Sequence, residues 1–383
     1  MKLIHLSDLH LGKRLGERNL IEDQRDILRK ILGIIDAERP DAVLIAGDVY
    51  DRAVPPAEAV QLLDDFLTRL AGRNLPTFLI SGNHDSAERL SFGAALMQRS
   101  GVHIAPLYAG RVSPVTLYDE YGPVHVYALP FVKPAHVRER FPEAEILSYT
   151  DALRVAVAQM GLQAAERNVL IAHQFVTGRG GADTPERSDS ENVSVGGVDN
   201  VDLSVFAPFD YVALGHIHKP QYVGRETVRY CGTPLKYSFS EVRHRKSVTV
   251  VELGPKGSVT LRTIPLTPLH EMRELRGTLR EILTMERADP HADDYFRVIL
   301  TDEDEIPDAI GKLRTLCPNV LRLEYDNART RAAVRLEAPD VLEGKSPVDL
   351  FAEFYEQQNA RPMSDVQRRF CEKLMEDIEE ATA

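Results

Sequence analysis

The stretch YVALGHIHKP occupies residues 211–220. Its apolar start, Tyr211 to Leu214, is typical of a short buried strand, and two histidines, His216 and His218, follow at once. Side chains two residues apart share one face of an extended segment, so these imidazoles can meet at one centre. Neutral imidazole is a good ligand for Mn, Fe and Zn. Two packed histidines in an ordinary turn would explain the stretch equally well, so the other segments of the chain must decide.

Four further strand signals end in the same way. The residues of metal-ligand type that follow them are Asp8 and His10 after KLIHLS, Asp48 after DAVLIAG, Asn83, His84 and Asp85 after PTFLISG, and His173 after VLIA. In open α/β sheets, ligands bind at the carboxyl ends of the strands, so five loops could bring these groups to one edge. A helix cap, a turn or a packed histidine explains each motif alone. Their joint occurrence predicts one shared metal site.

Strand and helix signals alternate in the first half of the chain and predict an α/β fold. Helical spacing covers residues 22–37, 56–72 and 88–98, between the strand signals just described. Later strand signals fall at 112–117, 124–128, 168–172, 210–214, 227–230 and 247–253. Residues 178–199 are rich in Gly, Ser and Asp, which predicts a long surface loop with a possible functional role.

The chain has 383 residues, which suggests more than one domain. It has no apolar run long enough to predict a transmembrane helix. Its three cysteines are far apart, which favours reduced thiols in the cytoplasm over a disulfide framework. The net charge is −12, and the acidity is concentrated after residue 250, where 18 Lys and Arg face 27 Asp and Glu. Charge therefore neither indicates nor excludes nucleic acid as a partner.

The C-terminal third has a different organisation. Residues 263–272 contain two prolines and are a plausible linker, and 295–304, 306–316 and 320–326 suggest strand, helix and strand. Two terminal helices are predicted to begin near Ser346 and at Ser364, the second with a capping box to Gln367. The second carries an apolar stripe of Val366, Phe370, Leu374 and Ile378. We expect three domains, 1–265, 266–342 and 343–383.

The candidate donors are too many for one ion. Carboxylate, carboxamide and imidazole groups in this number fit two ions that share a carboxylate, an arrangement used for displacement at phosphorus. Mixed nitrogen and oxygen ligands without thiolate favour Mn, Fe or Zn in a catalytic site over structural zinc.

The ordered set D-x-H, G-D-x-x-D, G-N-H-D, H and G-H-x-H resembles the calcineurin-like metallophosphoesterase superfamily. Within it, IHLSDLHLG, GDVYDRAVPP, ALGHIHKPQ, CGTPLKYSFSE and the tail LFAEFYEQQNARPMSDVQ resemble more particularly the SbcD family of bacterial nuclease subunits. The resemblance spans nearly the whole chain. It implies a sandwich of mixed β-sheets flanked by helices, a small α+β capping domain and a C-terminal helical hairpin.

The resemblance also implies a role for each candidate residue. Asp8, His10 and His218 would hold the first ion, Asn83, His173 and His216 the second, and Asp48 would bridge both. His84 would face the scissile phosphate, where it could stabilise the transition state or protonate the leaving oxygen. Asp85 would orient His84 from behind. The role of Asp51 is left open.

By the same resemblance, the chain is expected to be a Mn-dependent nuclease that cuts duplex DNA from 3′ to 5′ and opens single strands and hairpins internally. Its expected partner is the ATPase SbcC, bound through residues 346–380. A homodimer within a heterotetramer is expected through the helices at 56–72 and 88–98, although an ordinary core face would explain their apolar residues equally well. The alternatives are a small-molecule phosphodiesterase or phosphatase, and a DNA-end-binding scaffold with a vestigial site. Which of Arg179, Arg187, Arg243, Arg245 and Lys246 contact phosphates is left open.

Overall fold

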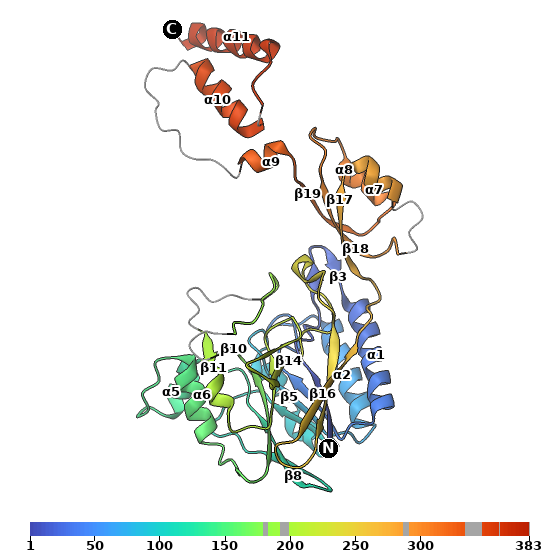
Figure 1. The fold of residues 1–383 in the computed structure, drawn as a ribbon, viewed down its shortest axis with the longest axis vertical. Helices are drawn as coiled ribbons and strands as arrows, with labels where there is room; N and C mark the ends of the chain where they lie inside the picture. The colour runs from blue at the N-terminus through green and yellow to red at the C-terminus, as the bar shows by residue number, and fades with distance from the viewer. Residues whose placement is uncertain (179–182, 192–198, 286–290, 334–346, 360, 383) are drawn as a thin grey trace. The chain divides into compact units, whose positions relative to one another are not determined.

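The computed structural model describes residues 1–178, 183–191, 199–285, 291–333, 347–359 and 361–382. The chain divides into two compact units, Met1–Leu269 and His270–Ala383 (Figure 1). The predicted loop at 178–199 is therefore described only in part, and Arg179 and Ser346 lie outside the described residues. No helix in the described parts of the chain is both long and apolar enough to cross a membrane.

Two six-stranded mixed sheets form the first unit. The order in one is β16 (Val259–Pro265), β15 (Ser247–Leu253), β1 (Lys2–Leu6), β4 (Ala42–Ala46), β5 (Thr77–Ile80) and β6 (Val102–Ala105). The order in the other is β13 (Gln221–Val223), β14 (Arg225–Tyr230), β12 (Tyr211–Gly215), β9 (Arg167–His173), β8 (Gly122–Ala128) and β7 (Val115–Asp119). Strands β1, β4, β5 and β6 are parallel, and so are β14, β12, β9 and β8. Their carboxyl ends therefore meet along one edge of each sheet.

An apolar core lies between the sheets. Leu44 and Phe78 of the first sheet pack with Ile171 and Tyr211 of the second, all at most 1% exposed. Strand alternation sends Val43 and Ile45 to the opposite face of the first sheet. Burial of each such side chain contributes about 1.5–3 kcal/mol, so this core fixes the sheets against each other. The predicted sandwich of mixed sheets is confirmed.

Helices flank the sandwich on both sides. In Figure 1, α1 (Ile21–Glu38) and α2 (Ala57–Ala71) lie along one flank, and α5 (Pro134–Arg140) and α6 (Tyr149–Ala158) along the other. Helix α1 buries Ile27, Ile31 and Ile35 at a spacing of four, as helical periodicity predicts. Helix α6, which the sequence analysis missed, begins with a capping box between Ser148 and Asp151.

The predicted helix at 88–98 is wrong as a single element. The segment forms α3 (Ala87–Leu90), α4 (Ala94–Met97) and the 3-10 turn η1 (Gln98–Ser100). Gly93 interrupts it with φ 72°, a left-handed conformation that a continuing helix cannot contain. The strand predicted at 112–117 begins later, as β7. Short elements complete the unit: β2 (Arg14–Leu15), β3 (Arg18–Asn19), β10 (Phe175–Thr177), β11 (Asn200–Asp202), η4 (Leu203–Phe206) and η5 (Phe239–Glu241).

A three-stranded parallel sheet organises the second unit. Its strands β17 (Met272–Gly277), β18 (Tyr295–Leu300) and β19 (Val320–Tyr325) pack with α7 (Leu279–Met285) and α8 (Ala309–Arg314) around Phe296, Val298 and Leu313. Strand β17 was not predicted from the sequence. Then follow α9 (Ala328–Ala333), α10 (Pro347–Asn359) and α11 (Asp365–Thr382). The predicted capping box at the start of α11 is present: the Ser364 backbone N–H donates to Gln367 Oε1 over 2.9 Å.

Candidate metal centre

The five predicted motifs all lie at the carboxyl ends of parallel strands. Asp8 and His10 follow β1, Asp48 follows β4, and Asn83 to Asp85 follow β5, all in the first sheet. His173 ends β9, and His216 and His218 follow β12, in the second sheet. The two edges meet directly, because His173 Nδ1 of the second sheet lies 2.8 Å from the Ala46 carbonyl oxygen of the first. The structure thus brings together every residue predicted to be a ligand.

The backbone at this edge is strained. Asp8, His10, Asp48 and His216 have φ of 52°, 44°, 47° and 103°, a region that non-glycine residues rarely occupy. Each such residue costs roughly 1–3 kcal/mol and persists only where the surroundings enforce it. Hydrogen bonds between the loops enforce these conformations: the Asp8 N–H donates to the Gly47 carbonyl oxygen, and the His10 N–H donates to the Asp48 carbonyl oxygen. Strain of this kind is typical of a site whose side chains are aimed for function.

The first group of donors comprises Asp8, His10 and His218, whose ligand atoms lie within 4.8 Å of one another. His10 Nε2 and His218 Nε2 are 3.1 Å apart. One oxygen of Asp8 accepts the His216 backbone N–H, whereas its Oδ2 is buried with no hydrogen-bond partner in the described structure. An orphaned carboxylate oxygen beside two facing imidazole nitrogens is suited to a cation.

The second group centres on Asn83. Its Oδ1 lies 3.0 Å from His173 Nε2 and 2.9 Å from His216 Nδ1. Asp48 stands between the two groups, with Oδ2 at 3.3 Å from His173 Nε2 and 3.7 Å from His10 Nε2. A carboxylate in that position can bridge two ions.

The tautomer of His173 tests whether these residues fit a cation. Its Nδ1 must donate to the Ala46 carbonyl, so Nε2 without a second proton would point a lone pair at two oxygens, those of Asn83 and Asp48. That contact is repulsive unless positive charge lies there. Burial alone would lower the pKa of His173, but Asp48 outweighs it and raises the pKa to about 9. The site therefore demands a positive charge, which a divalent cation would supply.

Burial governs the other ionisable groups of the site. It lowers the pKa of His216 to about 3 and the pKa of His10 well below its usual value. Both are thereby kept neutral, as metal ligation requires. Burial, with the neighbouring charge of Asp48, raises the pKa of Asp85 to about 6.

His84 differs from the predicted ligands in exposure. Its side chain is 16% exposed, against 0% for His10 and His173. Its backbone N–H donates to Asp48 Oδ1, and its Nδ1 donates to the Asp51 carbonyl oxygen over 2.9 Å. The ring therefore presents Nε2, 3.9 Å from Asp48 Oδ2, at the open side of the centre.

Asp85 and Asp51 each contact groups in the loops that carry the donors. Asp85 accepts backbone N–H groups of Val49, Tyr50 and Gly82, and so fixes the loop after β4 to the loop after β5. Its direct orientation of His84 stays a prediction. Asp51 pairs with Lys13 over 2.8 Å, with His10 Nδ1 at 3.9 Å.

Several residues that support the centre were missed. Ser190 and Glu191, from the 178–199 segment, contact His218, as does Glu241, and Lys246 pairs with Glu241. The only sequence signal is the SFSE stretch that ends at Glu241. In sequence, Lys246 groups with Arg243 and Arg245 as a basic cluster. It is only 5% exposed and committed to Glu241, so it is not available to a phosphate.

Gly215, the last residue of β12, allows the two sheets to approach each other. A Cβ there would lie 1.9 Å from the Ala46 carbonyl oxygen and 2.7 Å from His173 Nδ1. We expect Gly215→Ala to lower the free energy of unfolding by roughly 3 kcal/mol or more, measured by urea denaturation. Gly33→Ala in α1, where nothing lies within 4 Å, is the control and should be neutral or stabilising. Equal stability of the two variants would contradict the close approach.

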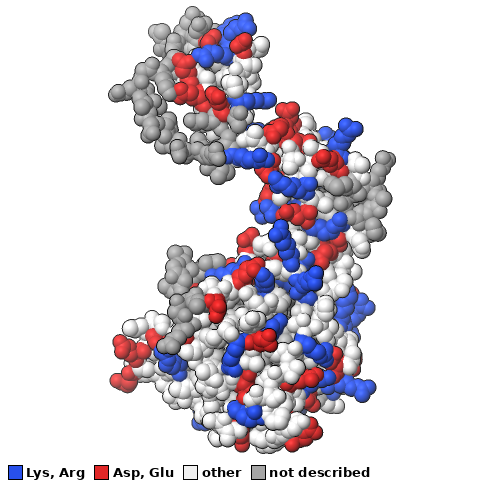
Figure 2. Space-filling view, viewed as in Figure 1, with Lys and Arg blue, Asp and Glu red and all other residues white. Residues whose placement is uncertain are grey.

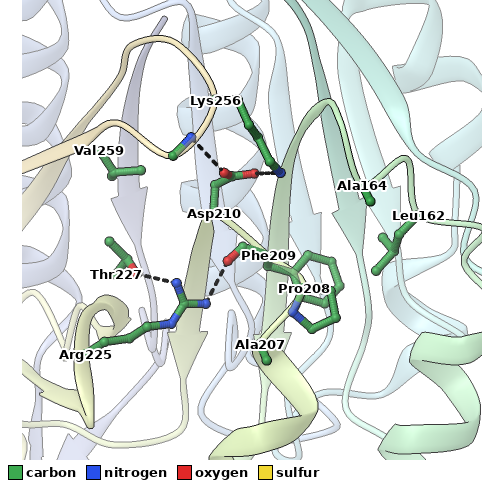
Figure 3. A pocket seen from close by; sticks show the side chains of 11 residues that line it. Leu162, Ala164, Ala207, Pro208, Phe209, Asp210, Arg225, Thr227, Lys256 and Val259 are labelled. Atoms are coloured by element: carbon green, nitrogen blue, oxygen red, sulfur yellow. Dashed lines mark hydrogen bonds and ion pairs between the residues drawn. The ribbon is translucent and has the colours of Figure 1, made fainter.

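A second cavity, of about 560 Å³, lies at the other end of β12 (Figure 3). Asp210 immediately precedes the strand, so this cavity is at the amino end and the histidines at the carboxyl end. Asp210 pairs with Lys256 over 2.8 Å, and Arg225 donates to Thr227 Oγ1 and the Phe209 carbonyl oxygen (Figure 3). These charged groups are engaged with the cavity wall itself, so the centre at the carboxyl ends is the stronger candidate.

Comparison with known proteins agrees with this geometry. Residues 1–220 match the model of the calcineurin-like phosphoesterase family, and residues 268–359 match a family described as the type 5 capsule protein repressor C-terminal domain. The chain is 32% identical to the SbcD subunit of the nuclease SbcCD from Staphylococcus epidermidis over 385 aligned residues, with 99% of each chain covered. The chain belongs to the SbcD family. A second SbcD relative, from Staphylococcus saprophyticus, is 31% identical, with 98% of each chain covered.

Individual solved structures resemble the chain only weakly. A dimetal phosphatase from Danio rerio is 13% identical with a TM-score of 0.37, covering 70% of this chain and 98% of its own. A Thermus thermophilus protein is 10% identical with a TM-score of 0.38, covering 68% and 98%. The fold assignment therefore rests on the family model and the sheet topology. Membership of the SbcD family makes the chain an enzyme, a metal-dependent phosphodiesterase.

Proposed function

We propose that this SbcD-family chain is the nuclease subunit of an SbcCD-type complex and hydrolyses DNA phosphodiesters with two divalent ions. The observation that carries the proposal is the convergence of seven ligand-type side chains from five loops on one largely buried centre, with the more exposed His84 beside Asp48. Asp8, His10, Asp48 and His218 would hold one ion, and Asp48, Asn83, His173 and His216 the other. Bound ions would lower the pKa of an attacking water and neutralise charge on the phosphoryl oxygens.

The protein's own groups would orient the reaction. Because His84 Nδ1 donates to the Asp51 carbonyl oxygen, the ring can donate from Nε2 to a phosphoryl oxygen, or protonate the departing 3′ oxygen, only in its doubly protonated form, whereas the neutral ring would accept a hydrogen bond at Nε2. Asp85 would keep the loops that carry Asp48 and Asn83 in register through its three backbone contacts. Asp51 would steady Lys13 and His10 at the rim.

We further propose that Mn²⁺ is the working metal: oxygen and nitrogen donors without thiolate suit Mn, Fe or Zn, and the family resemblance implies Mn²⁺ among them. Exonuclease action from 3′ to 5′ on duplex ends and endonuclease action on hairpins and single strands would serve DNA end processing in repair, recombination and replication. We propose these activities, and a location in the cytoplasm at the nucleoid, from the family resemblance. Figure 2 shows basic and acidic side chains intermingled on the visible face, so surface charge is no guide to the DNA path.

Two apolar surfaces support assembly. Helices α2, α3 and α4 line a groove of about 530 Å³ with Val60, Leu63 and Met97, and Phe92 beside it is 85% exposed. We propose that this groove pairs two copies of the chain within a heterotetramer.

On α11, Val366 and Phe370 are 73% and 68% exposed. We propose that this stripe docks on SbcC, as a helix lies in a partner's groove.

The proposal is tested by comparing a labelled hairpin-ended DNA duplex with a small chromogenic phosphodiester, both with Mn²⁺ and with SbcC and ATP present. Cleavage of the hairpin duplex is expected. Turnover of the small diester alone would replace the proposal by a small-molecule phosphodiesterase, the first alternative. Turnover of neither, with tight DNA binding, would favour the scaffold with a vestigial site.

The α11 stripe gives a separate prediction. The double variant Val366→Asp, Phe370→Asp should weaken binding to SbcC by at least about tenfold, because interface anchors of this type each contribute more than about 1 kcal/mol. Hydrolysis of the small diester by the variant alone should be unchanged. Binding can be measured by titration of purified SbcC, with the exposed Arg369→Asp as a control on another side of the helix. Unchanged binding by the double variant would place the SbcC contact elsewhere.

A further inference from the structure

A chain of polar groups, buried except for the half-buried Ser190, leads away from His218 on the side opposite His10. His218 Nδ1 lies 2.7 Å from Ser190 Oγ, which lies 2.6 Å from Glu241 Oε1, and Glu241 Oε2 lies 2.6 Å from Lys246 Nζ. These three residues come from separate parts of the chain: the 183–191 segment, η5, and the residue before β15. Family resemblance assigned no role to any of them.

Counting hydrogens along this chain fixes the tautomer of His218. A serine hydroxyl has one hydrogen, and an ionised carboxylate can only accept, so Ser190 donates to Glu241. The same hydroxyl then has only lone pairs for His218, and Nδ1 must carry the proton that it donates. Nε2 is therefore the unprotonated nitrogen, and it faces His10 Nε2 over 3.1 Å in the first donor group.

Lys246 anchors the far end of the chain. Its ammonium group donates to Glu241 Oε2, Thr233 Oγ1 and the His218 carbonyl oxygen, at 2.6, 2.6 and 2.8 Å. Glu241 is 0% exposed and Lys246 5%. A buried ion pair of this kind contributes little net stability compared with an apolar pair, so its presence calls for a role in specifying geometry.

A second contact holds the backbone of the same residue. Glu191 Oε1 accepts the His218 backbone N–H over 2.8 Å and the Ser188 hydroxyl over 3.1 Å. The 183–191 segment thus engages His218 at both its main chain and its ring. Asp189 N–H donates to Ser240 Oγ over 3.0 Å, which docks the segment without touching His218.

We propose that Glu241 is a positioning residue for the metal centre: acting through Ser190, it holds His218 with the proton on Nδ1 and presents Nε2 as a ligand. The metal rests on the proposed function, whereas the tautomer can be tested without it. Partners behind a metal-ligating histidine fix its tautomer and orientation, and their loss typically costs about 10–100-fold in metal affinity. The 183–191 segment is thereby part of the centre.

The decisive variant is Ser190→Ala in the full-length chain, because it removes the shortest contact of His218 Nδ1 and leaves the Glu241–Lys246 pair intact. Only the longer contact of 3.4 Å between Nδ1 and Glu241 Oε1 then remains. Calorimetric titration with Mn²⁺ should show about 10–100-fold weaker binding at one of the two ion positions. Ser190→Thr should restore it, and Glu241→Gln should reproduce the loss if the variant folds. Ser240→Ala, which removes a docking contact of the same segment, is the matched control and should bind as the wild type does.

The tautomer is measured on metal-free protein by two-bond nitrogen–proton correlation of ¹⁵N-labelled histidines, with the His218 signals assigned from their absence in His218→Gln. The wild type and Ser240→Ala should show the proton on Nδ1, and Ser190→Ala a mixture of tautomers. A wild-type His218 protonated on Nε2, or unchanged tautomer and Mn²⁺ affinity in Ser190→Ala, would overturn the proposal. Failure of the wild type to bind Mn²⁺ would instead refute the proposed function, and the spectra would still decide the role of Ser190.

Discussion

Replacement of Asp48 by asparagine is expected to reduce DNA hydrolysis by about 10³-fold or more. Asp48 Oδ2 lies 3.3 Å from His173 Nε2 and 3.7 Å from His10 Nε2, so this carboxylate is placed to reach both donor groups. Loss of its charge removes several kcal/mol of transition-state stabilisation, and about 1.4 kcal/mol corresponds to tenfold in rate. Initial rates on a labelled DNA duplex with Mn²⁺ measure the effect.

The same variant should lose its thermal stabilisation by Mn²⁺. A ligand at 100 times its dissociation constant adds about 2.7 kcal/mol to the stability of a protein that binds it only when folded. The wild type should therefore melt at a higher temperature with Mn²⁺ than without it. Asp65→Asn, at an exposed position of α2, is the control and should behave as the wild type does. The melting temperature of Asp48→Asn should rise much less. Activity near that of the wild type in Asp48→Asn would contradict the bridging role.

Replacement of His84 by alanine is expected to lower the rate of hydrolysis about 10²–10⁴-fold, the usual contribution of a positioned general acid or base. Its affinity for Mn²⁺ should stay within about threefold of the wild type, because the ring lies at the open side and its Nδ1 is held by a backbone carbonyl. Rates and calorimetric titration on the same preparation separate the two effects.

His136→Ala, on α5, which carries none of the predicted ligands, is the control and should change neither quantity. A His84→Ala variant that also loses one Mn²⁺ would show that His84 is a ligand. The assignment of seven ligands would then need revision.

The donors of the centre could be predicted because each follows a strand directly. The rule that parallel strands present their carboxyl ends at one edge brings Asp8, Asp48 and Asn83 together without knowledge of the three-dimensional structure. The meeting of the two sheets, seen in the bond from His173 to Ala46, is a tertiary contact over 127 residues that no local pattern contains. Family resemblance supplied that step.

The supporting groups could not be predicted for the same reason. Ser190, Glu241 and Lys246 look like surface residues in their own segments, and only long-range packing brings them together and pairs them.

The broken helix at Gly93 was missed because the apolar spacing on both sides fits one helix, whereas a single positive φ ends it. Strand β17 (MRELRG) carries charged residues at 273, 274 and 276 and lacks regular apolar alternation, so only its pairing with β18 reveals a strand.

The central claim is that one centre holds two ions. The most direct measurement is an anomalous difference map from a crystal of the full-length chain soaked in Mn²⁺. Two peaks are predicted, one among Asp8, His10 and His218 and one among Asn83, His173 and His216, with Asp48 contacting both. A single peak, or peaks away from these residues, would contradict the two-ion account.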